Sequence, residues 1–174
     1  MNKILVTLVS IALLLMLSCA LAEEVPAINW EDVHIEDTGI EGSWYTLNAV
    51  AVQFWVPDLF ENKDITEDDD ESMVAKFELP DGTAGIYAQY IEGFEGATID
   101  DLVASIESNN GKDAERCTLN GLDTVSYSIP DVDAVYVAFV TESGNYLQFI
   151  FTPVSDEKFA AVAQLVTASI MPEE

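Results

Sequence analysis

The residues best suited to chemistry lie in one acidic run, residues 61–71. Calcium binds six to eight oxygen atoms from carboxylates, carbonyls and water. Six side chains of the run could supply several of these oxygens: Asp64, Glu67, Asp68, Asp69, Asp70 and Glu71. The spacing differs from that of an EF-hand loop, and the glycine that such a loop needs is missing. The run therefore has two interpretations, a calcium-dependent loop and a solvated acidic loop, and the second is preferred.

Nucleophilic, zinc and nucleotide chemistry lack the residues that they need. His34 is the only histidine, and it stands among acidic residues near the start of the chain. A Ser-His-Asp or Cys-His site would have to use it, and a zinc site needs several His or Cys ligands. Neither common glycine-rich phosphate loop occurs. We therefore expect a non-enzymatic protein, with a carboxylate-based hydrolase as the remaining enzymatic alternative, because acids facing each other across a cleft cannot be recognised by counting.

Trp55 is the candidate for ligand binding through an aromatic ring. It belongs to a predicted strand in which alternate residues, Val50, Val52, Phe54 and Val56, form one apolar face. If that face enters the core, Trp55 lies on the opposite face of the sheet. There the ring is either exposed, and able to bind a peptide or a sugar, or covered by a helix.

The first 22 residues have the pattern of a signal peptide. Lys3 supplies a positive charge, residues 4–17 are apolar, and residues 20–22 read Ala-Leu-Ala, a small-x-small cleavage site. We expect cleavage after Ala22, secretion, and no transmembrane span in the remaining chain. The residues ending in Cys19 also resemble a bacterial lipoprotein box, so lipid anchoring to the membrane through Cys19 is the alternative.

The composition describes a strongly acidic protein of one domain. There are 32 Asp and Glu against six Lys and Arg, a formal net charge of −26. Such a charge repels nucleic acid and anionic membranes, and it permits cationic partners or divalent ions. The 174 residues, 49% of them hydrophobic, can form a packed core. We divide the mature chain into a leader, residues 23–43, with a short strand near Val33–Ile35, and a domain, residues 44–172.

The periodicity of apolar residues predicts strands separated by two main helices. Thr98 is suited to cap the first helix, the second begins near Ser155, and Asn120-Gly121 predicts a tight hairpin. Two strands, within residues 134–141 and 146–152, are apolar on both faces and should lie centrally. The order strands, helix, strands, helix predicts an α+β fold, an antiparallel sheet of about six to eight strands with two main helices packed on it.

Several segments together resemble the PsbP/Mog1-like α/β/α sandwich group, and within it small exported proteins of Gram-positive gut bacteria. They are Val52–Pro57, Leu119–Tyr127, Gly144–Phe151 and the final helix ending Ala168-Ser169-Ile170. The resemblance covers residues 44–171 and implies a binding or assembly protein, without assigning any functional residue. We therefore expect an exported acidic binding domain for an unknown protein or small ligand at the cell exterior. No nucleic acid partner and no cofactor are expected, calcium being the alternative.

Overall fold

The structure, a computed structural model, describes residues 25–173. The predicted signal peptide, its cleavage after Ala22 and the lipid attachment at Cys19 lie outside the described residues. Within residues 25–173, no helix is both long enough and apolar enough to cross a membrane.

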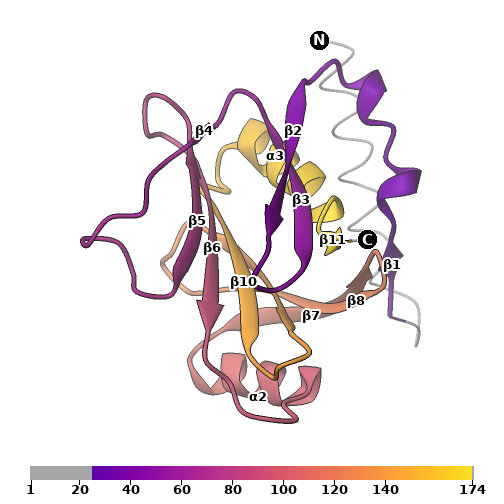
Figure 1. Cartoon of the computed structure of the whole chain (residues 1–174), viewed down its shortest axis with the longest axis vertical. Coiled ribbons are helices and arrows are strands. Elements are labelled where there is room, and N and C mark those ends of the chain that lie inside the picture. The colour runs from indigo at the N-terminus through magenta and orange to yellow at the C-terminus, as the bar shows by residue number, and fades with distance from the viewer. Residues whose placement is uncertain (1–24, 174) are drawn as a thin grey trace.

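The main sheet has eight strands in the spatial order β1-β7-β8-β9-β10-β6-β5-β4 (Figure 1). Their bounds are β1 Ala27–Ile28, β4 Glu61–Asn62, β5 Met73–Glu78, β6 Gly85–Ile91, β7 Lys112–Leu119, β8 Leu122–Ser128, β9 Val135–Val140 and β10 Tyr146–Thr152. All neighbouring strands are antiparallel except β1, which runs parallel to β7. The predicted α+β class is confirmed, and the sheet is mixed rather than purely antiparallel.

A second sheet of three strands stands apart from the main one. It contains β11 (Met171–Pro172), β3 (Val52–Pro57) and β2 (Gly42–Leu47), in that order. The expectation of one shared sheet was therefore wrong for the strand at residues 50–56. Its apolar face packs onto the main sheet instead of extending it, since the ring of Phe54 lies 5.0 Å from that of Phe149 and 5.8 Å from that of Phe77.

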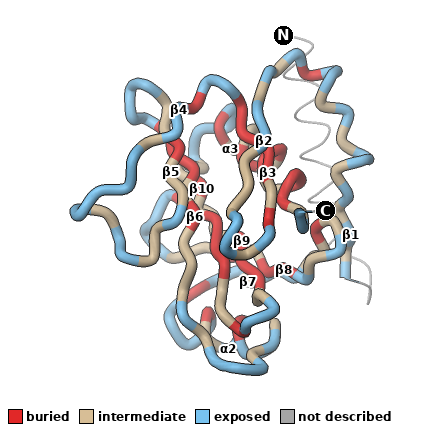
Figure 2. The backbone as a smooth tube through the Cα atoms, viewed as in Figure 1, coloured by how far each residue is buried: buried red, intermediate tan, exposed pale blue. Residues whose placement is uncertain are grey.

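The two faces of the main sheet are covered by different elements. Helix α3 (Glu157–Ala168) and the small sheet cover one face, where Phe77, Phe149 and Phe151 form the larger core. Helix α2 (Ile99–Ser108) covers part of the other face through Leu102 and Ile106. The strands β9 and β10 lie at the centre of the sheet, as predicted. In Figure 2 burial follows the central strands, whereas the acidic run is almost entirely exposed.

Local signals in the sequence are confirmed at the turn and at the helix start. Thr98 caps α2, accepting from the Asp101 backbone N–H while the Asp101 carboxylate accepts from the Thr98 N–H. Asn120 and Gly121 have φ of 48° and 88°, the left-handed pair that a tight hairpin turn requires. Helix α3 begins at Glu157, two residues later than expected, since Asp156 caps it by accepting from two backbone N–H groups.

The leader contains a short strand, but at Ala27–Ile28 rather than at Val33–Ile35. This segment pairs with the outer edge of β7, where the Thr118 N–H donates to the Pro26 carbonyl at 2.8 Å. The chain then forms two single 3₁₀ turns, η2 (Trp30–Asp32) and η3 (Ile35–Asp37). The leader is therefore docked on the domain along the side of the small sheet (Figure 1).

Candidate functional site

Asn120 fixes the N-terminal segment in its place. Its Oδ1 accepts from the backbone N–H of Trp30 at 2.6 Å. Its side-chain nitrogen Nδ2 donates to the carbonyls of Ala168 and Ile170, both at 2.8 Å. One turn residue thus joins the leader, the β7–β8 hairpin and the end of α3. Trp30 is held over the small sheet as a result.

All three tryptophans of the chain meet on the outer side of the small sheet. Trp44 of β2 and Trp55 of β3 are direct cross-strand partners. The ring centroid of Trp30 lies 5.5 Å from that of Trp44, at an interplanar angle of 83°, and 6.1 Å from that of Trp55. Edge-to-face contacts of this kind are favourable for aromatic rings. We call Trp30, Trp44 and Trp55 the tryptophan face.

The members of this cluster differ sharply in exposure. Trp55 is 5% exposed, whereas Trp44 is 44% exposed. The indole of Trp55 lies against Gly42, where an added Cβ would come within 2.2 Å of the ring. The Trp55 backbone N–H donates to the hydroxyl of the fully buried Ser169 at 2.8 Å. Trp55 is therefore the buried base of the cluster, and Trp44 is its solvent-exposed ring.

The prediction that Trp55 offers a ring to a ligand does not describe its place in the structure. The ring is covered, and its cover is the N-terminal segment rather than a helix. Alternation within the strand placed Trp55 opposite the apolar face correctly. The strand pattern carried no information about Trp30, which reaches the cluster only because β1 docks on β7.

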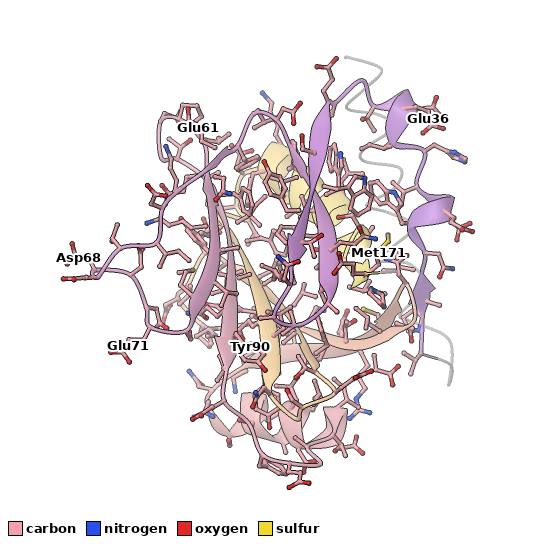
Figure 3. The ribbon with its side chains drawn as sticks, viewed as in Figure 1. Glu36, Glu61, Asp68, Glu71, Tyr90 and Met171 are labelled. Carbon is pink, nitrogen blue, oxygen red and sulfur yellow. The ribbon has the colours of Figure 1, made fainter. Side chains whose placement is uncertain are left out.

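Carboxylates follow Trp30 closely in the sequence, in a stretch that contains no Lys or Arg. Residues 25–62 contain seven Asp and Glu and no Lys or Arg. Glu31 and Asp32 follow Trp30 within η2, and Glu36 lies in η3, all three exposed. We call these three residues the acidic rim; Figure 3 marks Glu36 beside the N-terminal segment. His34 lies 3.6 Å from Glu36 and is itself exposed, so the only histidine belongs to this surface.

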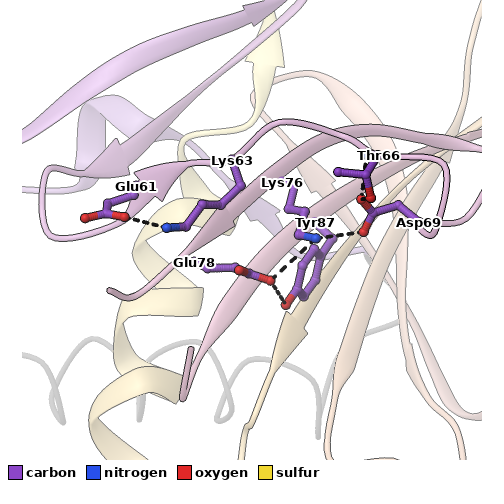
Figure 4. Close-up of polar contacts among 7 residues, drawn as sticks. All are labelled: Glu61, Lys63, Thr66, Asp69, Lys76, Glu78 and Tyr87. Carbon is purple, nitrogen blue, oxygen red and sulfur yellow. Dashed lines mark hydrogen bonds and ion pairs between the residues drawn. The ribbon is translucent and has the colours of Figure 1, made fainter. Parts of the chain in front are cut away.

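Within the acidic run, the carboxylate of Asp69 is hydrogen-bonded to neighbouring residues of the same chain (Figure 4). Asp69 accepts from the Lys76 ammonium at 2.7 Å and from the Thr66 N–H and hydroxyl at 2.8 and 2.9 Å. The Lys76 hydrogen bond, with those from Thr66, lowers the pKa of Asp69 from 3.8 to about 2. Glu78 accepts from the Tyr87 hydroxyl at 3.1 Å, and burial together with this bond raises the pKa of Tyr87 to about 12.

The other predicted calcium ligands do not gather around one point. Asp70 accepts from the N–H and hydroxyl of Ser72, which lowers its pKa. The remaining four are exposed, namely Asp64, Glu67, Asp68 and Glu71. Throughout residues 25–173, no three His, Cys, Asp or Glu side chains are grouped so as to hold a metal ion. Loops use Asp in this way to hydrogen-bond their own backbone, so the geometry gives the calcium hypothesis no support.

Two hollows on the described surface lie beside α2 and beside the start of the acidic run. One, of about 520 Å³, is bounded by α2 and residues 92–94 and contains the carboxylates of Glu92 and Asp101. The Asp101 carboxylate accepts from the Thr98 N–H and hydroxyl, which lowers its pKa, whereas a glycosidase acid needs a raised one. The other, of about 260 Å³, lies between β2 and β5 over the core rings of Phe54 and Phe77.

The described residues form an α+β sandwich that carries a tryptophan cluster with one exposed ring, Trp44, on a small second sheet. The similarity to known proteins lies in the fold. No protein-family model and no curated protein matches the sequence.

Solved structures place the chain within a known fold. Cyanobacterial PsbP (CyanoP) from Synechocystis sp. PCC 6803 is similar with a TM-score of 0.52 and 12% identity, over 76% of this chain and 93% of that one. A protein from Bacteroides thetaiotaomicron VPI-5482 has a TM-score of 0.50 and 15% identity, over 78% of this chain and 50% of that one. The Ran-binding protein Mog1p from Saccharomyces cerevisiae has a TM-score of 0.43 and 14% identity, over 78% and 97%. The chain has the PsbP/Mog1-like fold that the resemblance implied.

Proposed function

We propose that this chain is an exported, non-enzymatic binding domain that recognises its ligand through the tryptophan face. The observation that carries the proposal is the exposed indole of Trp44, 44% of which is open to solvent. A large aromatic ring left at the surface loses the stabilisation that burial would give it. Contact with a ligand would recover that stabilisation.

The base beneath Trp44 supports this role. Trp44 is paired with the buried Trp55, and the edge of the cluster is set by Trp30, whose backbone is bound to Asn120. A ring held by packed neighbours has little freedom to lose when a ligand binds, so less binding free energy is used in ordering it. The tryptophan face is thus preorganised for contact.

Export is proposed from the N-terminal sequence, with release after Ala22 or lipid attachment at Cys19 as its two forms. The non-enzymatic role is proposed from the residue inventory, since the sequence has a single histidine and neither common glycine-rich phosphate loop.

Affinity capture tests the proposal. Residues 23–174 are immobilised as wild type, as Trp44→Ala and as Val132→Ala, and each is exposed to the envelope and extracellular fractions of the producing organism. Val132 is the matched control, an apolar side chain with 45% exposure in the turn before β9. We expect species that are retained by wild type and Val132→Ala and lost by Trp44→Ala. Equal retention by all three variants would overturn the assignment of the tryptophan face.

A further inference from the structure

We infer that the ligand of the tryptophan face is a basic polypeptide segment, whose Lys or Arg side chains lie against Trp44 and pair with the acidic rim. This inference rests on the binding function proposed above and names the chemistry of the ligand. It begins from charge. The mature chain would keep only five Lys and Arg, since Lys3 lies before Ala22, and none of these five lies within residues 25–62.

Three of the five Lys and Arg in the described chain form ion pairs elsewhere. Lys63 pairs with Glu61 and Lys76 with Asp69, both on the acidic run or its neighbouring strands. Arg116 pairs with Asp100 beside α2. Within residues 25–173, no Lys or Arg forms an ion pair with Glu31, Asp32 or Glu36. The contacts of the acidic rim are with Asn29, which donates to Asp32, and with His34 beside Glu36, so its exposed carboxylates can pair with Lys or Arg from another molecule.

An exposed indole ring and carboxylates without a Lys or Arg partner are suited to a cation for two separate reasons. The face of a tryptophan ring attracts Lys and Arg more strongly than that of any other aromatic residue. The carboxylates add direct attraction and steer a basic segment during its approach. A neutral or anionic ligand covering the same surface would remove water from these carboxylates and give no charge in return. Charge complementarity thus selects a basic segment among ligands able to cover an aromatic ring.

Direct titration tests the inference. Fluorescein-labelled peptides of about ten lysines or ten arginines are titrated with residues 23–174, and fluorescence anisotropy is recorded in about 20 mM and about 300 mM NaCl. Peptides of the same length made of glutamate, or of glycine and serine, are the controls. We expect saturable binding of the basic peptides alone, weakened by salt. Trp44→Ala should weaken it by about tenfold or more, and no Trp44 effect would overturn the inference.

A pair of charge-matched variants separates the acidic rim from the general negative field of the protein. Glu31→Gln/Asp32→Asn/Glu36→Gln and Glu67→Gln/Asp68→Asn/Glu71→Gln each remove three carboxylates from exposed positions. Figure 3 places Asp68 and Glu71 at the opposite end of the molecule from Glu36. The rim variant should bind about tenfold more weakly, and the loop variant should stay within about threefold of wild type. Equal losses would show non-specific attraction and contradict the inference.

The inference and the proposed function fail in distinguishable ways. If capture depends on Trp44 but the basic peptides do not bind, the binding function stands and the basic ligand is wrong. An uncharged oligosaccharide that binds through Trp44, or self-association that Trp44→Ala abolishes in sedimentation equilibrium, would identify a different occupant and equally overturn the inference. Thermal unfolding of every variant, with melting temperatures close to wild type, assigns any lost binding to the surface and not to the fold.

Discussion

The acidic run and the tryptophan face are both rich in groups that could do chemistry, and they use them in opposite ways. In the run, Asp69 and Asp70 hydrogen-bond to residues of the same loop and to Lys76. In the tryptophan face, Trp55 is buried and Trp44 is left exposed, and residues 25–62, which contain all three tryptophans, have seven Asp and Glu and no Lys or Arg. The comparison teaches that a dense group of polar side chains does not make a binding site when those side chains hydrogen-bond to one another and to their own loop. A binding site needs a side chain that packing holds in place and that remains exposed to a ligand.

The largest expected effect concerns the buried half of the tryptophan face. Trp55→Ala should lower the free energy of unfolding by about 3–5 kcal/mol, because it removes a large buried ring and leaves a cavity. Urea denaturation monitored by circular dichroism measures it. Trp44→Ala is the control and should cost less than about 1 kcal/mol, as exposed positions do. Similar losses in the free energy of unfolding for the two variants would contradict the distinction between a buried Trp55 and an exposed Trp44.

The contact between Gly42 and Trp55 gives the next largest effect. Gly42→Ala should cost about 1–3 kcal/mol, because the new Cβ would stand 2.2 Å from the indole and force the ring to move. The same displacement should change the near-ultraviolet circular dichroism of the tryptophans. Ser43→Ala, at the neighbouring residue, is the control. Gly121→Ala would be a poor control, because Gly121 has a φ of 88° that alanine rarely adopts. An unchanged spectrum and stability in Gly42→Ala would contradict the described packing.

The ion pair in the acidic run should show its effect through pH. Asp69 has a pKa of about 2 in the folded chain, below its ordinary value of 3.8. A lowered pKa stabilises the fold above the ordinary pKa, and the stabilisation is lost as the pH falls through the folded value. The melting temperature of wild type should therefore exceed that of Asp69→Asn above about pH 4, and the difference should disappear near pH 2. Asp68→Asn, at an exposed position, is the control for the loss of one carboxylate from the run; a constant difference for Asp69→Asn would contradict this role.

The smallest expected effect is that of calcium. Because the carboxylates of the run do not converge among the described residues, calcium at about 1 mM should leave the melting temperature unchanged at constant ionic strength. Magnesium at the same concentration is the control for general screening. A rise in melting temperature with calcium alone, abolished in Asp68→Asn/Glu71→Gln, would restore the calcium hypothesis. It would also contradict the distinction drawn between the acidic run and the tryptophan face.

Local elements of the fold were predictable because short-range interactions determine them. Thr98 correctly predicted the start of a helix, and Asn120-Gly121 correctly predicted a hairpin turn. The separation of β2 and β3 into a second sheet was not predictable in this way. It depends on the pairing of Met171 with Gln53 and on aromatic contacts between distant strands, and apolar alternation predicts a strand without naming its partner.

The candidate site was predictable only in part, for a similar reason. The tryptophans all fall within residues 30–55, a signal that could have suggested a cluster. Trp30 is held at the cluster by its hydrogen bond to Asn120, 90 residues away in the sequence. The acidic run was ambiguous because an ion and the backbone of the loop itself are bound by the same carboxylates. Only the three-dimensional arrangement shows which of these partners is present at Asp69.

Tryptophan quenching tests most directly whether Trp44 is an exposed ring in an acidic surrounding. Residues 23–174 are titrated with caesium and with iodide at matched ionic strength, as wild type and as Trp44→Phe. Caesium should quench wild type more strongly than iodide does, because carboxylates concentrate cations near the exposed ring, and Trp44→Phe should remove most of the quenchable emission. Equal quenching by the two ions, or unchanged quenching in Trp44→Phe, would contradict the described tryptophan face.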